Sequence, residues 1–440
     1  MALIAQEPTS TKPRPRGVIV VATLMLFSMF FGAGNLIFPP MLGAHAGAGF
    51  LPALVGFLAT GVALPVLTMV AVAITGNDVF DLARRVGPGF GLVFTVLVYI
   101  SIGCAYALPR TAVVSYSAAI TPLTGVTGPW WQALFAAIFF GVSLLLVFDP
   151  SGVADKLGKY LTPVLLALLA LLFVLGMAGL HGAASPAIAP FDSHPLAGGL
   201  VEGYMTMDSL GAMAFGIIVL SSLRYKGVAE GTPLIRSASI AAAAAGGLLA
   251  LIYTALALLG RVMPDGGTFT DGALLLSAAA RATLGAPGMM IFGAIVLLAC
   301  ISTAAGLLGA ASEFFHRIIP QVSYRAWAML FALISVAVAA FGLSAVLTLA
   351  GPIIGCLYPP AIALVTMTLI ERLLPFTLSL ALKVPVLVAT FWAIATVAAG
   401  YLPALALVLS WSPGQATELG WLVPTILAAF IFLPIDARRR

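Results

Sequence analysis

The chain has 440 residues, of which 62% are hydrophobic and 8% are charged, and its formal net charge is +5 at pH 7. So few charged residues cannot cover a soluble globule of this length, which excludes that class of protein. The basic residues lie in short connectors between apolar runs and not on one face, which argues against nucleic-acid binding and favours a polytopic membrane protein.

Apolar windows of about 20 residues, long enough to cross a bilayer as helices, recur along the whole chain. We predict spans near 18–48, 50–75, 89–117, 130–148, 158–180, 197–223, 234–260, 287–312, 325–342, 344–370, 384–410 and 419–435. If the N-terminus is inside, 17 of the 20 Lys and Arg residues face the cytoplasm, since only Arg261 and Arg281 fall outside and Arg110 lies within a span. This bias predicts an all-α protein with twelve spans and both termini cytoplasmic. We also expect a short amphipathic helix on the outer face at 269–284.

A break interrupts the first span near its centre at four residues, Gly32, Ala33, Gly34 and Asn35. Glycine sustains a helix poorly, and non-helical backbone at mid-depth is tolerated only where it lines a cavity or is buried in protein. The free N–H groups of the second half-helix can bind a carboxylate, so we expect these four residues to form the carboxylate side of a polar site. A close packing contact at small residues is the alternative. Pro39 and Pro40 are expected to begin the second half-helix.

The third span carries Arg110 toward its outer half, with Tyr106 one turn earlier on the same face. An arginine within a span must be paired or reach water, and its planar fork suits a carboxylate. We expect Arg110 to act in an outer gate or as scaffold. Tyr106 either closes over a substrate with its hydroxyl or packs with that hydroxyl satisfied locally.

The sixth span is also interrupted, by the stretch from Glu202 to Gly211, which places two carboxylates within a span. A carboxylate at this depth is costly and marks a functional site. Asp208 has three candidate roles: binding a substrate ammonium, binding or relaying a coupling cation, or pairing with Arg110. Glu202 is expected at the outer boundary, as part of a gate or scaffold or as a solvated vestibule charge. The residues expected to face a substrate are Tyr204, Met205, Thr206, Met207 and Asp208.

Two interrupted spans that lie five spans apart predict an inverted repeat, because a second unit of five helices enters the membrane with the opposite topology. The expected organisation is a tail at 1–17, the first repeat at 18–192, the second repeat at 193–370, and two further spans with a short C-terminus at 371–440.

Five stretches carry a resemblance to a known family, in matching order and spacing over nearly the whole chain. They are FFGAGNLIFPPMLG at 30–43, ALPRTAVVSY at 107–116, EGYMTMDSLGAMAFGI at 202–217, ACISTAAGL at 299–307 and YPPAIAL at 358–364. The chain resembles the bacterial branched-chain amino acid:cation symporters. The resemblance implies the leucine-transporter fold and uptake of leucine, isoleucine and valine, driven by a cation that is usually sodium, in the bacterial cytoplasmic (inner) membrane. Ser117 departs from the acidic residue common at that place in the family, which puts in doubt a charge network at the outer end of the third span.

In relatives with this fold the cation lies between the broken first span and the eighth span. The resemblance therefore implies one sodium site, with sodium as co-substrate and no cofactor. Helical spacing puts the Ala299 carbonyl and the hydroxyls of Ser302 and Thr303 on one face, and the carbonyls of Ser28 and Phe31 complete the expected set. The alternative is that both hydroxyls bond back to carbonyls one turn earlier.

Enzymes and channels are the competing classes. The four histidines lack metal-ligand spacing, and no nucleophile–base pair or phosphate-binding loop is present. A channel usually builds its lining from oligomer symmetry, which an internally repeated chain does not need. We therefore predict a transporter that works by alternating access, with a monomer sufficient for transport. Its partners are branched-chain amino acids, sodium and the lipid bilayer; a proton-coupled transporter of apolar amino acids that uses Asp208 is the alternative.

Overall fold

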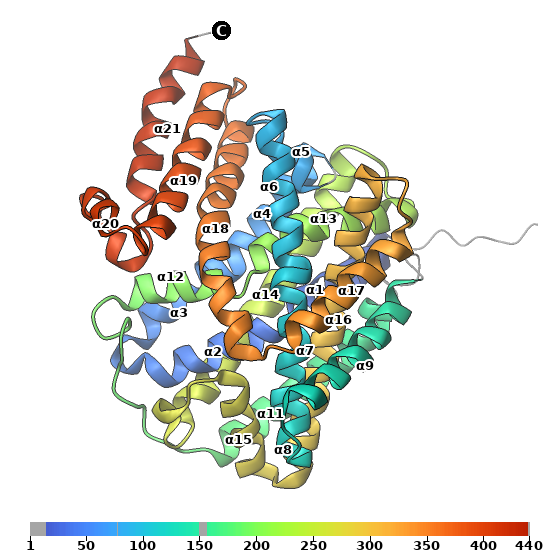
Figure 1. Cartoon of the computed structure of the whole chain (residues 1–440). Coiled ribbons are helices and arrows are strands. Elements are labelled where there is room, and N and C mark those ends of the chain that lie inside the picture. Colours follow the sequence, from blue (N-terminus) through green and yellow to red (C-terminus); the bar gives the residue numbers. More distant parts are fainter. Residues whose placement is uncertain (1–14, 77, 149–155, 439–440) are drawn as a thin grey trace, which may run out of the picture.

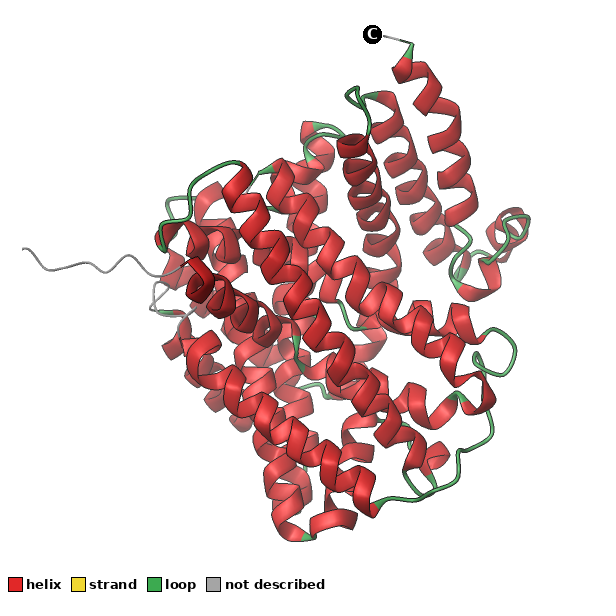
Figure 2. Ribbon diagram, turned by 180° about the vertical axis from the view of Figure 1, so that it is seen from behind, coloured by secondary structure: helices red, strands yellow, loops and turns green. Residues whose placement is uncertain are grey.

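The computed structural model describes residues 15–76, 78–148 and 156–438, and every regular element in these ranges is helical (Figures 1 and 2). The first half contains α1 (Pro15–Phe30), α2 (Ala33–His45), α3 (Phe50–Leu58), α4 (Leu64–Thr75), α5 (Val79–Ala83), α6 (Pro88–Ile100), α7 (Ala107–Ser115), α8 (Thr121–Thr124), α9 (Pro129–Val147) and α11 (Thr162–Gly179). The second half contains α12 (Pro195–Met205), α13 (Asp208–Tyr225), α14 (Thr232–Val262), α15 (Gly272–Leu284), α16 (Ala286–Ile318), α17 (Tyr324–Ala339), α18 (Leu343–Leu373), α19 (Leu380–Ala399), α20 (Pro403–Leu409) and α21 (Leu422–Ala437). The predicted tail up to residue 14 and the last two residues lie outside the described part of the chain.

Ten spans meet the length and hydropathy expected of a membrane helix within the described residues, when the bent pair α1 and α2 is taken as one. The predicted spans at 325–342 and 419–435 correspond to α17 and α21, which are apolar but have only 16 residues each. The prediction of twelve spans is thus supported for ten. The predicted span at 384–410 is divided, because α19 ends at Ala399 and a separate short helix, α20, begins at Pro403.

Both predicted interruptions are present. α1 and α2 are separated by two residues and bend by 71°. α12 and α13 are separated by Thr206 and Met207. The expected amphipathic segment at 269–284 is also helical, as α15.

Each broken span packs on a helix from the other half of the chain. The second half of the first span, α2, packs on α14, and the first half of the sixth span, α12, packs on α3. Glycine brings the backbones together in both places. A Cβ atom at Gly43 would lie 1.8 Å from the carbonyl oxygen of Ala257, and one at Gly199 would lie 1.9 Å from that of Ala53. Close approach at small residues is the usual way for helices to associate in a membrane.

The outer surface of the bundle is apolar where helices have few neighbours. α9 and α11 expose large hydrophobic side chains, including Leu145 and Val174, as a lipid-facing helix does. At the edge of the molecule α19 packs on α18, and α21 packs on α19 (Figure 1). Both broken spans lie in the interior, which places their exposed backbone groups away from lipid.

Candidate functional site

Asn35 caps the helix that follows the first break. The N–H group of Gly32 donates to the Asn35 side-chain oxygen at 3.0 Å, so the amide caps the start of α2. Helix geometry leaves the N–H groups of Ala33 and Gly34 without intrahelical partners. The expectation for Pro39 and Pro40 is wrong: both lie inside α2, because the helix already begins at Ala33.

The second break is formed by a strained residue and a local cap. Met207 adopts left-handed backbone angles (φ 65°, ψ 14°), which cost a non-glycine residue about 1–2 kcal/mol. The Thr206 hydroxyl donates to the carbonyl of Gly203 at 2.8 Å and accepts from the N–H group of Asp208 at 3.4 Å. Strain of this kind is typical of functional sites, where the surrounding structure imposes the geometry.

Asp208, at the second break, is hydrogen-bonded to Asn35 at the first break. One of its oxygens, Oδ2, accepts from the Asn35 amide at 2.8 Å and from the Tyr253 hydroxyl at 2.5 Å, and Asn35 also contacts Tyr253. All three side chains are buried. Within the described residues no ion pair joins Asp208 to Arg110, so the structure does not show the pairing considered for them.

Arg110 instead contacts neutral groups. Its guanidinium donates to the Tyr106 hydroxyl at 2.6 Å and to the carbonyl oxygens of Met205 and Thr206 at 3.1 and 3.2 Å. It is 4% exposed, and its Nε has no partner among the described residues. It also stands over the start of α2, since a Cβ atom at Gly34 would lie 2.7 Å from Nη2. A buried cation beside free N–H groups forms a strongly positive environment.

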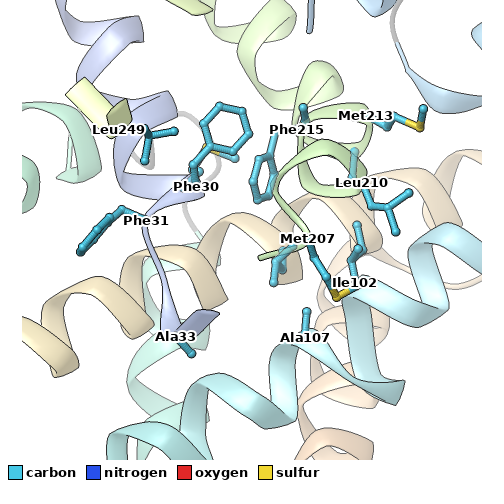
Figure 3. Packing of buried hydrophobic residues seen from close by; sticks show 14 of the residues in the cluster. Phe30, Phe31, Ala33, Ile102, Ala107, Met207, Leu210, Met213, Phe215 and Leu249 are labelled. Atoms are coloured by element: carbon cyan, nitrogen blue, oxygen red, sulfur yellow. The ribbon is translucent and has the colours of Figure 1, made fainter. Parts of the chain in front are cut away.

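These groups surround a small cavity, here called the central cavity, with a volume of about 30 Å³. In this conformation it has room for water but not for an amino acid. Arg110 and Asp208 line it together with apolar side chains. The rings of Phe30 and Phe215, which line the cavity, lie against each other with centroids 5.8 Å apart, and Met207 and Ile102 lie near them (Figure 3). The cavity thus offers opposite charges and an apolar wall.

The predicted cation ligands gather beside this cavity. The Ser302 hydroxyl lies 2.9 Å from the carbonyl oxygens of both Ser28 and Ala299, and the Thr303 hydroxyl lies 3.4 Å from that of Ser28. The Ser28 hydroxyl is buried without a partner in the described structure. Phe31 is buried and stacks on Phe27, and among the described residues no hydrogen bond joins it to the other four. The bond from Ser302 to Ala299 is also the local contact expected if the hydroxyls were purely structural.

Thr303 is part of both the central cavity and the group of oxygen atoms around Ser302, here called the oxygen cluster. It lines the central cavity, and a Cβ atom at Gly32 would lie 2.6 Å from its hydroxyl oxygen. The first break therefore touches the oxygen cluster directly.

Three predicted residues lie away from the central cavity. Tyr204, Met205 and Glu202 line a second hollow, here called the outer cavity, between α12, α18, α19 and the segment after α20. Tyr106 does not line the central cavity either; it contacts Arg110, which does, through its hydroxyl and its ring. Of the predicted substrate residues, the central cavity is lined by Gly32, Ala33, Asn35, Thr206, Met207 and Asp208.

Sequence reasoning did not identify Tyr253 or the apolar wall. Tyr253 is in α14, a helix rich in alanine and leucine, where a hydroxyl must find a buried partner. A lone hydroxyl in an apolar helix was therefore the feature of the sequence that could have identified Tyr253. Phe30, Ile102 and Phe215 gave none, because they resemble the many other apolar residues of their spans.

Comparison with known proteins gives a consistent result. A family model described as branched-chain amino acid transport protein matches residues 16–439. The branched-chain amino acid permease BrnQ of Corynebacterium glutamicum is 47% identical over 423 residues, which are 96% of each chain. The branched-chain amino acid transport system 2 carrier protein of Pseudomonas aeruginosa is 36% identical over 94% of each chain, and the permease BraB of Bacillus subtilis is 36% identical over 80% of each.

Solved structures are similar in fold. The nucleobase-cation-symport-1 family transporter Mhp1 in a closed conformation has a TM-score of 0.58 at 18% identity, covering 95% of this chain and 91% of its own. The manganese transporter of Eremococcus coleocola has a TM-score of 0.57 at 15% identity, covering 99% and 98%. Mhp1 has the leucine-transporter fold, so this similarity confirms the predicted fold class.

Proposed function

The chain belongs to the branched-chain amino acid transport protein family, and on this premise we propose that it is a sodium-coupled symporter that carries leucine, isoleucine and valine into the cell. It is a multi-pass membrane transporter and not an enzyme, as its sequence predicted. The substrates follow from the names of the relatives. The sodium coupling, the bacterial inner membrane and a transport unit of one chain belong to the proposal.

The observation that carries the coupling proposal is the position of Thr303. Thr303 lines the central cavity, and its hydroxyl is also part of the oxygen cluster with Ser28, Ala299 and Ser302. Carbonyls of broken helices together with hydroxyls are the ligands that transporters of this kind use for sodium. A cation there would fix Gly32 against α16 and so favour the shape of the break that binds substrate.

The two charged ends of an amino acid have complementary partners in the central cavity. The carboxylate would lie at the start of α2, with the N–H groups of Ala33 and Gly34 and the guanidinium of Arg110. The ammonium would lie on Asp208. The carbonyls of Met205 and Thr206 are already engaged by Arg110, so the carboxylate of Asp208 is the remaining strong acceptor of the second break.

The apolar wall suits a branched side chain. Phe30, Ile102, Met207 and Phe215 line the central cavity beside the charged groups, and methionine adapts to different aliphatic shapes. A pocket of this kind separates ligands that differ by one methylene only about 10- to 200-fold. Leucine, isoleucine and valine should therefore share it.

The first test measures substrate and coupling ion together. Protein in proteoliposomes should accumulate labelled leucine under an inward sodium gradient, and excess isoleucine or valine should compete. Without sodium, leucine should only equilibrate. Uptake that is unchanged in sodium-free buffer but abolished when a proton gradient is collapsed would replace this proposal with proton coupling through Asp208.

The second test concerns the oxygen cluster. Thr303→Ala should raise the sodium concentration for half-maximal uptake by about tenfold, because a lost hydroxyl ligand costs about 1–1.5 kcal/mol. Thr303→Ser keeps the hydroxyl and should behave like the wild type. Thr283→Ala is a matched control, since that hydroxyl bonds back to Ala279 within α15. A normal sodium requirement in Thr303→Ala would remove this residue from the cation site.

A further inference from the structure

The third span, which the sequence predicts as one continuous helix, is interrupted near its centre. α6 and α7 are joined by a wider, π-helical turn at Ser101–Ala105, here called the third break. Gly103 within it has non-helical backbone angles (φ −81°, ψ −129°). Turns of this kind are rare within helices and often occur at functional sites.

The third break forms part of the wall of the central cavity. Ile102 lies within the break and Ala107 follows it at the start of α7, and both residues line the cavity. Figure 3 shows Ile102 near Met207 of the second break. Gly32 of the first break also lines the cavity. Each of the three interrupted spans therefore provides one wall.

The central cavity must enlarge before it can hold an amino acid. Its volume of about 30 Å³ has room for water only. At least one wall therefore moves when the substrate proposed above binds.

The first and second breaks are held in place by close contacts and hydrogen bonds. A Cβ atom at Gly32 would lie 2.6 Å from the Thr303 hydroxyl oxygen, so the first break is packed directly against α16. Asp208 of the second break accepts hydrogen bonds from Asn35 at 2.8 Å and from Tyr253 at 2.5 Å. Movement of either wall would disrupt close packing or buried hydrogen bonds.

The third break, in contrast, has free space on its far side. A Cβ atom at Gly103 would lie 3.7 Å from the Phe331 ring and 3.9 Å from the Ala311 methyl group, which are ordinary contact distances. Room for one methyl group therefore exists between the third break, α16 and α17. None of these three residues is among those that line the central cavity. The Ser101 hydroxyl is buried without a hydrogen-bond partner in the described structure, so it does not anchor the break.

We propose that the third break is the wall that moves when substrate binds. The substrate side chain displaces Ile102, and Gly103 moves into the space beside Phe331 and Ala311. Gly103 absorbs the change in backbone angles, because glycine adopts a wider range of them than other residues do. The size of this space then limits the length of the side chain that the transporter accepts. The inference rests on the proposed function and adds a determinant of substrate size to it.

The first variant fills the space behind the wall. Gly103→Ala adds one methyl group, which meets no described atom closer than 3.7 Å. Leucine should bind about tenfold more weakly or worse, since a misfit of one methylene in an apolar pocket is worth about 10- to 200-fold. Alanine has the same charged ends and a much shorter side chain, so its inhibition constant should be unchanged. Equilibrium binding of labelled leucine to the purified full-length protein in sodium buffer, with alanine as competitor, measures both quantities.

A matched control is Gly141→Ala in α9, where no described atom lies within 4 Å of the added Cβ atom. It makes the same substitution in another membrane helix and should leave the binding of leucine and of alanine unchanged.

Two variants on the neighbouring helices leave Gly103 itself intact. Ala311→Ser adds one atom to the same space from α16 and should weaken leucine but not alanine. Phe331→Leu removes ring atoms from that space and should have the opposite effect. A leucine analogue with one more methylene in its side chain should bind about tenfold more tightly to Phe331→Leu than to the wild type. If Gly103→Ala does not fold, these two variants still decide the question.

The size dependence separates a moving wall from a purely structural role. Equal weakening of leucine and alanine in Gly103→Ala and Ala311→Ser would contradict the inference, and so would unchanged binding of both. A longer analogue that binds Phe331→Leu no better than the wild type would show that the break does not move into this space. If the wild type bound no leucine at all, the proposed function would fail as well, so the two failures are distinguishable.

Discussion

Arg110→Gln should lower leucine uptake at low leucine concentrations by about 100-fold or more. In the proposed complex the substrate carboxylate pairs with a guanidinium that has only neutral partners in the free protein. Removal of one member of a buried charge pair costs about 3–5 kcal/mol, and 1.4 kcal/mol is a factor of ten. Arg110→Lys keeps the charge but cannot hold both carbonyls as the planar fork does, and should lose less.

A competition experiment separates a direct role of Arg110 from a scaffold role. Isopentylamine is leucine without its carboxylate, so its weak inhibition of leucine binding should be unchanged in Arg110→Gln. Arg281→Gln, which alters an exposed arginine of α15, controls for the loss of a positive charge. If Arg110 only shapes the second break, leucine and isopentylamine should weaken by the same factor, and that result would contradict the proposed contact.

The fold was largely predictable because a bilayer restricts the solutions. Only helices satisfy every backbone group in lipid, so the apolar windows and the bias of Lys and Arg were enough to place most spans. α17 and α21 show the limit: hydropathy marked their positions, but their 16 residues do not meet the length of a span. Helix starts were predicted less well. Pro39 and Pro40 suggested a first turn, yet Asn35 caps the helix earlier.

The polar residues of the site were predictable because polar side chains are rare inside membrane spans. Their partners and the apolar residues of the site were not. Asn35, Arg110 and Asp208 stood out because each needs a partner inside the membrane. Which partners they find depends on tertiary packing, so Tyr253 was missed, and Arg110 contacts the carbonyl of Thr206 without an ion pair to Asp208. Helical spacing also could not tell that Tyr204 and Met205 face the outer cavity, because the left-handed turn at Met207 changes the direction of the chain between them and Asp208.

Asp208→Asn should weaken leucine binding by about 10- to 100-fold without lowering the thermal unfolding midpoint. The ammonium loses a charge-assisted hydrogen bond worth about 1.5–3 kcal/mol. The asparagine oxygen can still accept from Asn35 and Tyr253, and a neutral side chain is easier to bury than a carboxylate. Equilibrium binding and a thermal melt of the same preparation measure both quantities, with the exposed Asp192→Asn as control.

The decisive comparison uses 4-methylpentanoate, which is leucine without its amino group. Its inhibition should be unchanged in Asp208→Asn and weakened in Arg110→Gln, whereas isopentylamine should show the reverse pattern. A general loss of packing at the breaks cannot produce two opposite patterns. If Asp208→Asn instead binds leucine normally but no longer responds to a proton gradient, Asp208 carries the coupling proton, and the ammonium must be held by another acceptor in the central cavity.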